Sequence, residues 1–307
     1  MPNIAVTSPS FSTHPKLAKT ITDHFPGTKL NLTKTRYRDD ALIDYLRGVD
    51  GAVIGLERIT EEVLQQLPDL KIISKYGVGL NNLDQDACER HDVKIGWTGG
   101  TNKLSVAELT LGNMLVLSRN IFRTANQLKQ GIWNKNGGWQ LSGKTVGIIG
   151  LGFIGKEVVR LLQPFNCRIL VNDLLDQTEY YQKHGLEEVD KETLMHESDF
   201  ITLHVPLDDS TENLIDADAL ARMKPSAYLI NSARGGIVDE VALKGALRGG
   251  VIAGAAIDAY MEEPPTDQDL LSIETLICTP HIGGNAVEAV EQMGMSAINH
   301  LVDFFNE

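Results

Sequence analysis

With 307 residues, 42% of them apolar and 22% charged, the chain has an ordinary globular composition and the length of two domains. A formal net charge of −13 without any block of lysine or arginine argues against a nucleic-acid partner, because phosphates favour a basic face. Three widely separated cysteines predict neither a disulfide framework nor a metal site, and the lack of a signal segment or of about 20 consecutive apolar residues predicts a cytoplasmic protein outside the membrane.

The first hundred residues alternate between short apolar runs and helical spacing. Strands are predicted at residues 4–8, 29–33, 52–56, 71–76 and 94–98. Between them the apolar positions are spaced as in helices, for example Leu42, Ile43 and Leu46. Strands that alternate with helices predict a parallel sheet with helices on both faces.

The rest of the chain repeats this alternation after one long helix, predicted from about residue 104 to 130. A polar, glycine-rich stretch follows it, and a last helix is predicted at 286–304. Further strands are predicted at 145–149, 168–172, 200–205, 228–231, 251–257 and 276–278. These runs are nearly continuous valine, isoleucine, leucine and alanine, as expected of strands buried on both faces. We therefore expect an α/β fold with two Rossmann-like, doubly wound parallel sheets.

A G-x-G-x-x-G run follows the strand at 145–149 and precedes a helix predicted at 156–162. Gly150 permits a tight turn, Gly152 lets the backbone approach a pyrophosphate, and Gly155 allows close packing of helix and strand. The helix N-terminus offers N–H groups to the phosphates. A glycine-rich turn that binds nothing is the alternative, and the flanking strand and helix make it the weaker one.

Asp173 ends the next predicted strand, 18 residues after Gly155, where a carboxylate can accept a hydrogen bond from the ribose 2′-hydroxyl. Its charge would repel a 2′-phosphate, and residues 174–183 contain no arginine to neutralise it. The sequence therefore favours NAD over NADP.

Three ionisable residues each follow a predicted strand of the second sheet. They are Arg234, Glu263 and His281. Ligands bind at the carboxyl ends of strands in open parallel sheets, so all three side chains can face one crevice. Taken singly, each residue is better explained as a surface ion pair, a solvated carboxylate or a helix-capping histidine. Taken together, in this order and beside a dinucleotide motif, the three residues indicate catalysis.

At these residues the sequence resembles the D-isomer-specific 2-hydroxyacid dehydrogenase family, in its D-3-phosphoglycerate dehydrogenase-like branch without a C-terminal regulatory domain. The resemblance extends over essentially the whole chain. The motifs that carry it, besides those above, are Gly77-Val78-Gly79, Ser105-Val106-Ala107-Glu108, Leu141-Ser142-Gly143-Lys144, His204-Val205-Pro206-Leu207 and Met223-Lys224-Pro225.

The resemblance implies an NAD-dependent D-2-hydroxyacid dehydrogenase or 2-keto acid reductase, with a hydride moving between nicotinamide and C2. His281 would be the general acid–base, because imidazole exchanges protons near neutral pH. Glu263 would fix the tautomer of His281, and Arg234 would bind the substrate carboxylate with its planar fork. The backbone N–H groups of Gly77, Val78 and Gly79 would bind the other side of that carboxylate.

The resemblance also implies that an NAD-binding domain, residues 99–284, is inserted into a flavodoxin-like substrate domain, residues 1–98 and 285–307. Hinges near 98–102 and 281–285 would let the cleft between them close. The helix and loop around residues 104–139 match the region through which the family forms homodimers. Further residues implied at the cofactor site are Phe153, Ile154, His204, Val205, Pro206, Ala233, Asp258 and Gly283.

The substrate is less defined than the reaction. Arg58 follows a strand and Lys103 begins the long helix, so these two cations would suit a phosphate or a second carboxylate, while exposed ion pairs explain them equally well. Phosphoglycerate dehydrogenases commonly carry an arginine-rich stretch where this chain has Arg58 alone. Phosphoglycerate, glyoxylate and hydroxypyruvate therefore all stay open.

Two other functions are compatible with these motifs. Relatives of the family act as NAD(H)-binding corepressors, so a redox sensor that keeps Arg234, Glu263 and His281 is one alternative. A dehydrogenase of another small oxyanion, such as phosphite, is the other. The sequence leaves open the favoured direction of the reaction and the number of subunits.

Overall fold

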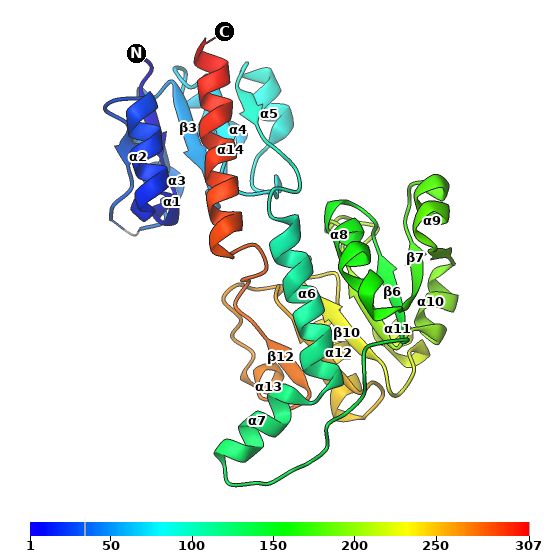
Figure 1. Cartoon of the computed structure of the whole chain (residues 1–307). Helices are drawn as coiled ribbons and strands as arrows, with labels where there is room; N and C mark the ends of the chain where they lie inside the picture. The colour runs from blue at the N-terminus through cyan, green and yellow to red at the C-terminus, as the bar shows by residue number, and fades with distance from the viewer. Residues whose placement is uncertain (34, 307) are drawn as a thin grey trace. The chain divides into compact units, whose positions relative to one another are not determined.

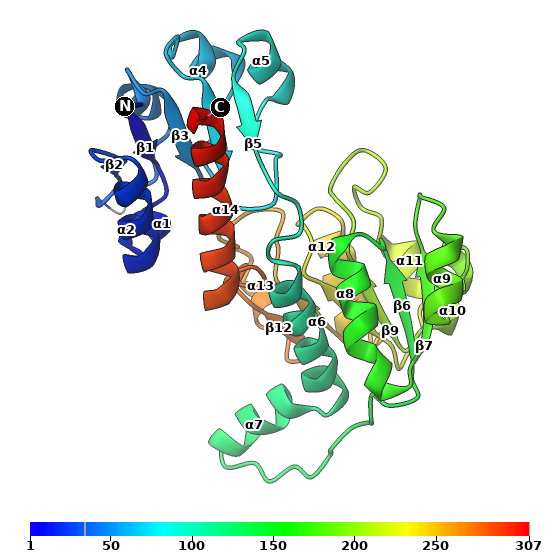
Figure 2. The same ribbon diagram turned by 45° about the horizontal axis from the view of Figure 1, so that its top comes forward.

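The computed structural model describes residues 1–33 and 35–306, and the chain divides into two compact units (Figures 1 and 2). The first unit is Met1–Asn102 together with the chain from Asn285 onward, and the second is Lys103–Gly284. Among the helices of the described residues, none has both the length and the apolar character that a membrane span requires.

The first unit is a five-stranded parallel sheet in the order β2-β1-β3-β4-β5, the flavodoxin-like arrangement. The strands are β1 (Ile4–Val6), β2 (Lys29–Leu30), β3 (Gly51–Ile54), β4 (Ile72–Lys75) and β5 (Lys94–Gly96). The helices are α1 (Pro9–Thr13), α2 (Pro15–His24), α3 (Asp39–Leu46), α4 (Glu61–Gln65), α5 (Gln85–Arg90) and α14 (Val287–Asn306).

Two apolar cores lie on opposite faces of this sheet, because its strands are buried on both sides. Helices α3, α4 and α5 cover one face, and α2 and α14 cover the other. Figure 1 shows α14 beside β3, and α14 also contacts β4 and β5. Gly294 permits the close approach of α14 to α2, since a Cβ there would overlap the side chain of Leu17.

The second unit is a seven-stranded parallel sheet in the order β12-β11-β10-β9-β6-β7-β8. The strands are β6 (Thr145–Ile149), β7 (Arg168–Asn172), β8 (Glu187–Glu188), β9 (Phe200–Leu203), β10 (Tyr228–Asn231), β11 (Gly254–Ile257) and β12 (Leu276–Cys278). Strand order reverses between β6 and β9, and this switch point is where dinucleotides bind in doubly wound sheets.

Helices cover both faces of the second sheet as well. They are α6 (Lys103–Ser118), α8 (Phe153–Leu162), α9 (Thr178–His184), α10 (Lys191–Glu197), α11 (Ala217–Arg222), α12 (Glu240–Arg248) and α13 (Gln268–Leu271). Helix α7 (Ile121–Lys129) also belongs to this unit, but none of its residues is buried. Two large apolar cores lie between the sheet and the helices that cover it. The predicted fold class, two doubly wound parallel α/β sheets, is confirmed.

The structure differs from the predicted elements in several places. The helix predicted from 104 to 130 is two helices, because Asn120 adopts a left-handed φ of 52° between them. The helix after the glycine run begins at Phe153, three residues before the predicted start. The short edge strand β8 was not predicted, since its two residues are both glutamates with no apolar pattern.

Candidate cofactor and active site

The glycine run forms the turn between β6 and α8 in the second unit. Gly150 has a φ of +91°, and a Cβ on it would lie 2.6 Å from the carbonyl oxygen of His204. A Cβ on Gly155 would overlap the Gly150 carbonyl, whereas one on Gly152 would meet no protein atom within 4 Å. The loop is thus packed from behind at Gly150 and Gly155 and open at Gly152, as a cradle for a pyrophosphate at the α8 N-terminus requires.

Asp173 follows β7 and lies against this loop. Its Oδ2 accepts a hydrogen bond from the Leu151 N–H at 2.5 Å, and its Oδ1 accepts one from the Leu175 N–H at 2.8 Å. A carboxylate can accept several hydrogen bonds, so these contacts orient the group without exhausting it. Asp173 therefore ties the loop to the end of β7, next to where a ribose would lie.

The carboxyl ends of β9 and β10 carry two buried polar atoms without a hydrogen-bond partner in the described chain, His204 Nδ1 and Ser232 Oγ. The residues follow directly on Leu203 and Asn231, which are paired across the two strands. Unpartnered buried polar atoms are costly and need an explanation, and a polar ligand at the switch point supplies one. Ser198 Oγ is also unpartnered, but it lies before β9, at the other edge of the sheet.

His204 is a neutral imidazole at physiological pH. Burial lowers its pKa from 6.5 to about 3, since the charged form would lose its hydration. Its Nε2 lies 3.0 Å from Thr202 Oγ1. His204 and Ser232 can therefore offer hydrogen bonds to a cofactor without adding charge, and together with the glycine cradle they fit NAD. Ser232 was not predicted from the sequence, because a serine after a strand carries no signal of its own.

The remaining residues implied at the cofactor site surround the same edge of this sheet. Val205 packs against Gly150, and Ala233 is buried after β10, with its N–H donated to Asn231 Oδ1 at 3.1 Å. Phe153, the first residue of α8, is 61% exposed. The others in this group, by their place in the chain, are Ile154 in α8, Pro206 after β9, Asp258 after β11 and Gly283 after β12.

His281 and Glu263 are in direct contact. His281 Nδ1 lies 2.7 Å from Glu263 Oε1 and 2.9 Å from Oε2, and Oε1 also accepts a hydrogen bond from the Tyr260 N–H at 3.2 Å. A carboxylate can only accept, so the shared hydrogen is on Nδ1. Nε2 is then the nitrogen that can take up or release a proton.

Asp258 holds the turn that carries His281. Its side chain is 1% exposed and accepts hydrogen bonds from Thr279 Oγ1 at 2.6 Å, from the Ile282 N–H at 2.8 Å and from the Gly283 N–H at 2.7 Å. These donors lie on both sides of His281, whose φ of +54° is left-handed and unfavourable for a residue with a side chain. The clamp on this turn is a role of Asp258 that the sequence analysis did not predict.

Arg234 follows β10 and is partly buried. Its Nη1 donates a hydrogen bond to the Ala233 carbonyl at 2.7 Å, and its own carbonyl accepts one from Asn231 Nδ2 at 2.9 Å. Burial lowers the pKa of Arg234, while the negative charge of Glu263 acts in the opposite direction. The guanidinium remains charged. Glu263 thus interacts with both His281 and Arg234, and the three residues form one group at the carboxyl edge of the sheet.

The other residues predicted to bind substrate are distributed over both units. Gly77, with a φ of +134°, begins the loop after β4 of the first unit, where the Val78 carbonyl accepts a hydrogen bond from Trp97 Nε1 at 2.9 Å. Arg58 is an exposed side chain of the same unit. Lys103 belongs to the second unit, where its Nζ lies 3.7 Å from Glu157 Oε2. Within the residues described, no three His, Cys, Asp or Glu side chains converge as metal ligands.

Comparison with known proteins gives one family. Residues 111–283 match the family described as D-isomer specific 2-hydroxyacid dehydrogenase, NAD binding domain. The chain is 36% identical over 280 residues to the hydroxypyruvate reductase of Thermotoga maritima, covering 89% of this chain and 90% of that one. It is 38% identical over 259 residues to the D-3-phosphoglycerate dehydrogenase of Methanocaldococcus jannaschii, covering 83% of this chain and 49% of that one. The chain thus spans about half the length of that dehydrogenase.

The fold has close counterparts among solved structures. The D-lactate dehydrogenase of Aquifex aeolicus, crystallised with NAD and lactic acid, superposes with a TM-score of 0.86 at 24% identity. The match covers 99% of this chain and 95% of that one. At this level of identity the likeness shows a shared fold.

Proposed function

Because the chain belongs to the D-isomer-specific 2-hydroxyacid dehydrogenase family, we propose that Arg234, Glu263 and His281 carry out NAD-dependent interconversion of a small 2-keto acid and its D-2-hydroxy acid. The chain is an NAD-dependent oxidoreductase that acts on CH–OH groups. The observation that supports these three residues as the catalytic group is the contact of His281 Nδ1 with Glu263 Oε1 at 2.7 Å, on the sheet that carries the glycine cradle.

The cofactor would be held by groups of the second unit. The α8 N-terminus and the open position at Gly152 would bind the pyrophosphate, and Asp173 would bind a ribose hydroxyl. His204 Nδ1 and Ser232 Oγ would bind polar atoms farther along the switch point. When bound, NADH supplies the hydride that C2 of the substrate accepts.

The catalytic residues would manage the charge that develops on the substrate. Arg234 would pair with the substrate carboxylate, since its planar fork matches two oxygens. His281 Nε2 would give its proton to the C2 oxygen as that oxygen gains negative charge. Glu263 would hold the imidazole by Nδ1 so that Nε2 faces the substrate, as the carboxylate of a catalytic triad does for its histidine. Binding of the carboxylate by Gly77, Val78 and Gly79 remains part of the proposal.

The substrate is proposed to be a small, monoanionic 2-keto acid such as hydroxypyruvate or glyoxylate. The relatives that support this substrate class are the hydroxypyruvate reductase and a glyoxylate reductase of Thermococcus litoralis, each 36% identical to this chain. Lys103 already has an acidic neighbour in Glu157, which makes it a weaker candidate for binding a phosphate. Arg58 is exposed and stays the candidate for a second anionic group.

A steady-state assay tests the reaction. NADH absorbance would be followed with glyoxylate, hydroxypyruvate, pyruvate and 3-phosphohydroxypyruvate, using the wild type, His281→Ala and the control His196→Ala, an exposed histidine of α10. We expect turnover with an unphosphorylated acid that collapses only in His281→Ala. Full activity in His281→Ala would contradict the assigned role. Tight NADH binding without turnover of any acid would favour the redox sensor, and oxidation of phosphite would favour the oxyanion dehydrogenase.

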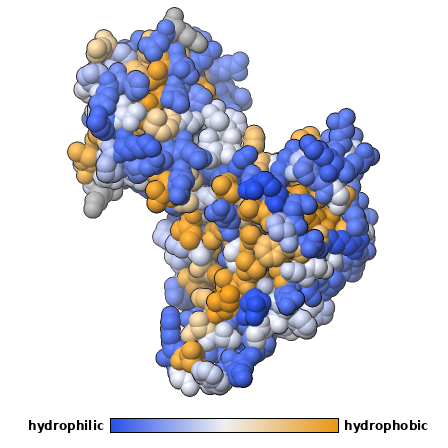
Figure 3. Space-filling view, in the orientation of Figure 1, coloured by the Kyte–Doolittle hydropathy of each residue, from blue (hydrophilic) through white to orange (hydrophobic). Residues whose placement is uncertain are grey.

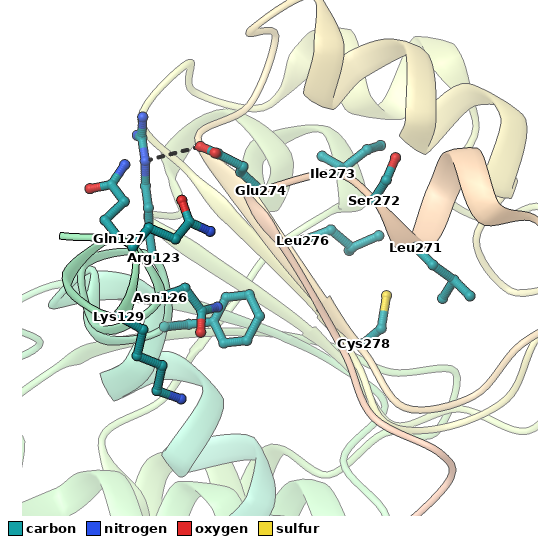
Figure 4. A pocket seen from close by; sticks show the side chains of 12 residues that line it. Arg123, Asn126, Gln127, Lys129, Leu271, Ser272, Ile273, Glu274, Leu276 and Cys278 are labelled. Carbon is teal, nitrogen blue, oxygen red and sulfur yellow. Dashed lines mark ion pairs between the residues drawn. The ribbon is translucent and has the colours of Figure 1, made fainter. Parts of the chain in front are cut away.

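We also propose that the protein is a homodimer built around α7. No residue of α7 is buried, and Figure 3 shows apolar side chains gathered over α6, the helix that precedes it. A pocket of about 430 Å³ lies between α7 and the chain around β12, and at its edge Arg123 Nε lies 3.5 Å from Glu274 Oε2 (Figure 4). The large exposed apolar residues of α7 and the following loop are Ile121, Phe122, Leu128, Ile132, Trp133 and Trp139. A second copy of the chain would remove this surface from water.

The mass in solution tests the dimer. Size-exclusion chromatography with light scattering should give twice the chain mass of 33.7 kDa, and Phe122→Asp should shift it toward one chain. Val241→Asp, which changes an exposed apolar residue of α12, is the control. A wild-type monomer would contradict the proposal.

The cysteines Cys88, Cys167 and Cys278 form no disulfide, which supports a reducing compartment such as the cytoplasm.

A further inference from the structure

We propose that Trp97 is a positioning residue for the substrate anion. Its indole N–H donates to the Val78 carbonyl at 2.9 Å and so orients and polarises the peptide between Val78 and Gly79, whose N–H binds the substrate carboxylate. This inference rests on the proposed function, which assigns the loop Gly77-Val78-Gly79 to that carboxylate. It adds the atom that makes the contact and the residue that prepares it.

The loop needs an external support because its backbone is irregular. It follows β4, and Gly77 has a φ of +134°, a conformation that residues with a side chain rarely adopt. Glycines on both sides of Val78 allow many backbone conformations, so a single orientation of the peptide has to be held by other groups. The hydrogen bond from Trp97 holds it at the Val78 carbonyl.

Fixing the carbonyl also fixes the next N–H. In a trans peptide the C=O of one residue and the N–H of the next point in opposite directions, so the Gly79 N–H points away from the indole. Hydrogen bonds in series polarise one another, and a donor on the carbonyl therefore makes the N–H of the same peptide a stronger donor. Trp97 thus determines both the direction and the strength of the Gly79 N–H.

Trp97 can act as this support because its own backbone is anchored on both sides. It follows Gly96, the last residue of β5, where a Cβ would approach the Cγ of His300 to 3.0 Å and overlap its Cβ. On the other side Thr98 Oγ1 lies 2.9 Å from His300 Nε2. His300 belongs to α14, which packs along the same sheet. Alternate residues of an extended chain face opposite sides, so Gly96 and Thr98 meet α14 while the Trp97 side chain turns to the loop.

The alternative is that the indole only fills space beside the loop and satisfies one carbonyl. Trp97 is 39% exposed, so removing its indole N–H should leave the fold intact. Trp97→Phe keeps an aromatic ring without the donor, and Trp97→His restores a ring N–H. Tyr37→Phe is the matched control, because it removes a polar group from a partly exposed aromatic side chain of the same unit.

The experiment measures kcat and KM for the best 2-keto acid, the dissociation constant of oxalate from the NADH complex by calorimetry, and that of NADH by fluorescence. We expect Trp97→Phe to raise KM and the oxalate constant about 3- to 10-fold, the effect of one hydrogen bond. We expect kcat within about 3-fold of wild type and unchanged NADH affinity, with Trp97→His between Trp97→Phe and wild type.

Three outcomes would overturn the proposal. They are oxalate and KM values for Trp97→Phe within 2-fold of wild type, equal losses in Trp97→Phe and Trp97→His, and a loss confined to kcat. Thermal unfolding of each variant checks that the fold is retained. If the wild type reduces no 2-keto acid, the proposed function fails on that ground, and the oxalate titration still decides the role of Trp97: absent or unaltered oxalate binding overturns it.

Discussion

Replacement of Asp258 by asparagine tests whether the turn around His281 is held by the buried carboxylate. Oδ1 accepts from Thr279 Oγ1 and the Ile282 N–H, and Oδ2 accepts from the Gly283 N–H. Asparagine has one oxygen, so its best orientation keeps two donors satisfied and turns an NH₂ group toward the Gly283 N–H. The reverse orientation leaves two donors without an acceptor.

The magnitude follows from these contacts. A buried N–H that loses its acceptor costs about 1–3 kcal/mol, and bonds to a charged oxygen are about twice as strong as bonds to a neutral one. We therefore expect Asp258→Asn to lower the free energy of unfolding by about 2–4 kcal/mol. For a unit of this size 1 kcal/mol corresponds to roughly 2–4 °C, so the melting temperature should fall by about 5–15 °C.

The assay is thermal unfolding by calorimetry together with kcat for the best 2-keto acid. The turn holds His281 at a left-handed φ of +54°, so loss of the clamp should also lower kcat by at least about 10-fold. Asp190→Asn is the control, because Asp190 is an exposed N-cap of α10 and asparagine caps helices equally well. A melting temperature within about 2 °C of wild type, with kcat unchanged, would refute the clamp.

Three further predictions concern the cofactor edge of the second sheet. Gly152→Ala should leave the melting temperature unchanged but weaken NADH binding at least about 10-fold. Gly155→Ala, whose Cβ would overlap the Gly150 carbonyl, should lower both the melting temperature and the NADH affinity. Thermal unfolding and NADH fluorescence distinguish these two variants. Asp173→Ser should lower kcat/KM for NADH and raise it for NADPH, and an unchanged ratio would count against the ribose contact. Burial lowers the pKa of His204 to about 3, so below pH 6.5 the unfolded chain takes up a proton that the folded chain does not, and stability falls by about 1.4 kcal/mol per pH unit. Urea unfolding should therefore show that His204→Asn loses about 2 kcal/mol less stability than wild type between pH 7 and pH 5.

Much of the candidate site could be predicted from the sequence, because parallel sheets bring the carboxyl ends of their strands to one edge. Arg234, Glu263 and His281 are separated by 29 and 18 residues, yet each follows a strand and the structure groups them. The glycine run could also be interpreted from the sequence, because its spacing reflects three steric requirements of one turn. In both cases local sequence and sheet topology determine the geometry together.

The supporting contacts could not be predicted, because they join segments whose register only the folded chain defines. Asp258 meets donors 21 to 25 residues later, and Trp97 meets a carbonyl 19 residues earlier. Nothing in the neighbouring residues distinguishes this aspartate from a surface carboxylate. The break at Asn120 has a similar cause, since most asparagines in helical stretches do not adopt the left-handed conformation that ends α6.

The two carboxylates near His281 divide the task of placing its imidazole, and their environments explain why both are needed. Glu263 is 40% exposed on its side chain and holds the ring itself, a contact that contributes at most about 1 kcal/mol to stability in water. Asp258 is buried and holds the backbone, where its three bonds offset the roughly 1–3 kcal/mol cost of a strained φ. The strained turn, kept in one conformation, fixes the position of the His281 backbone. The exposed Glu263 then fixes the orientation of the imidazole ring. The position of Nε2 thus depends on both contacts, although only Asp258 adds substantially to the stability of the fold.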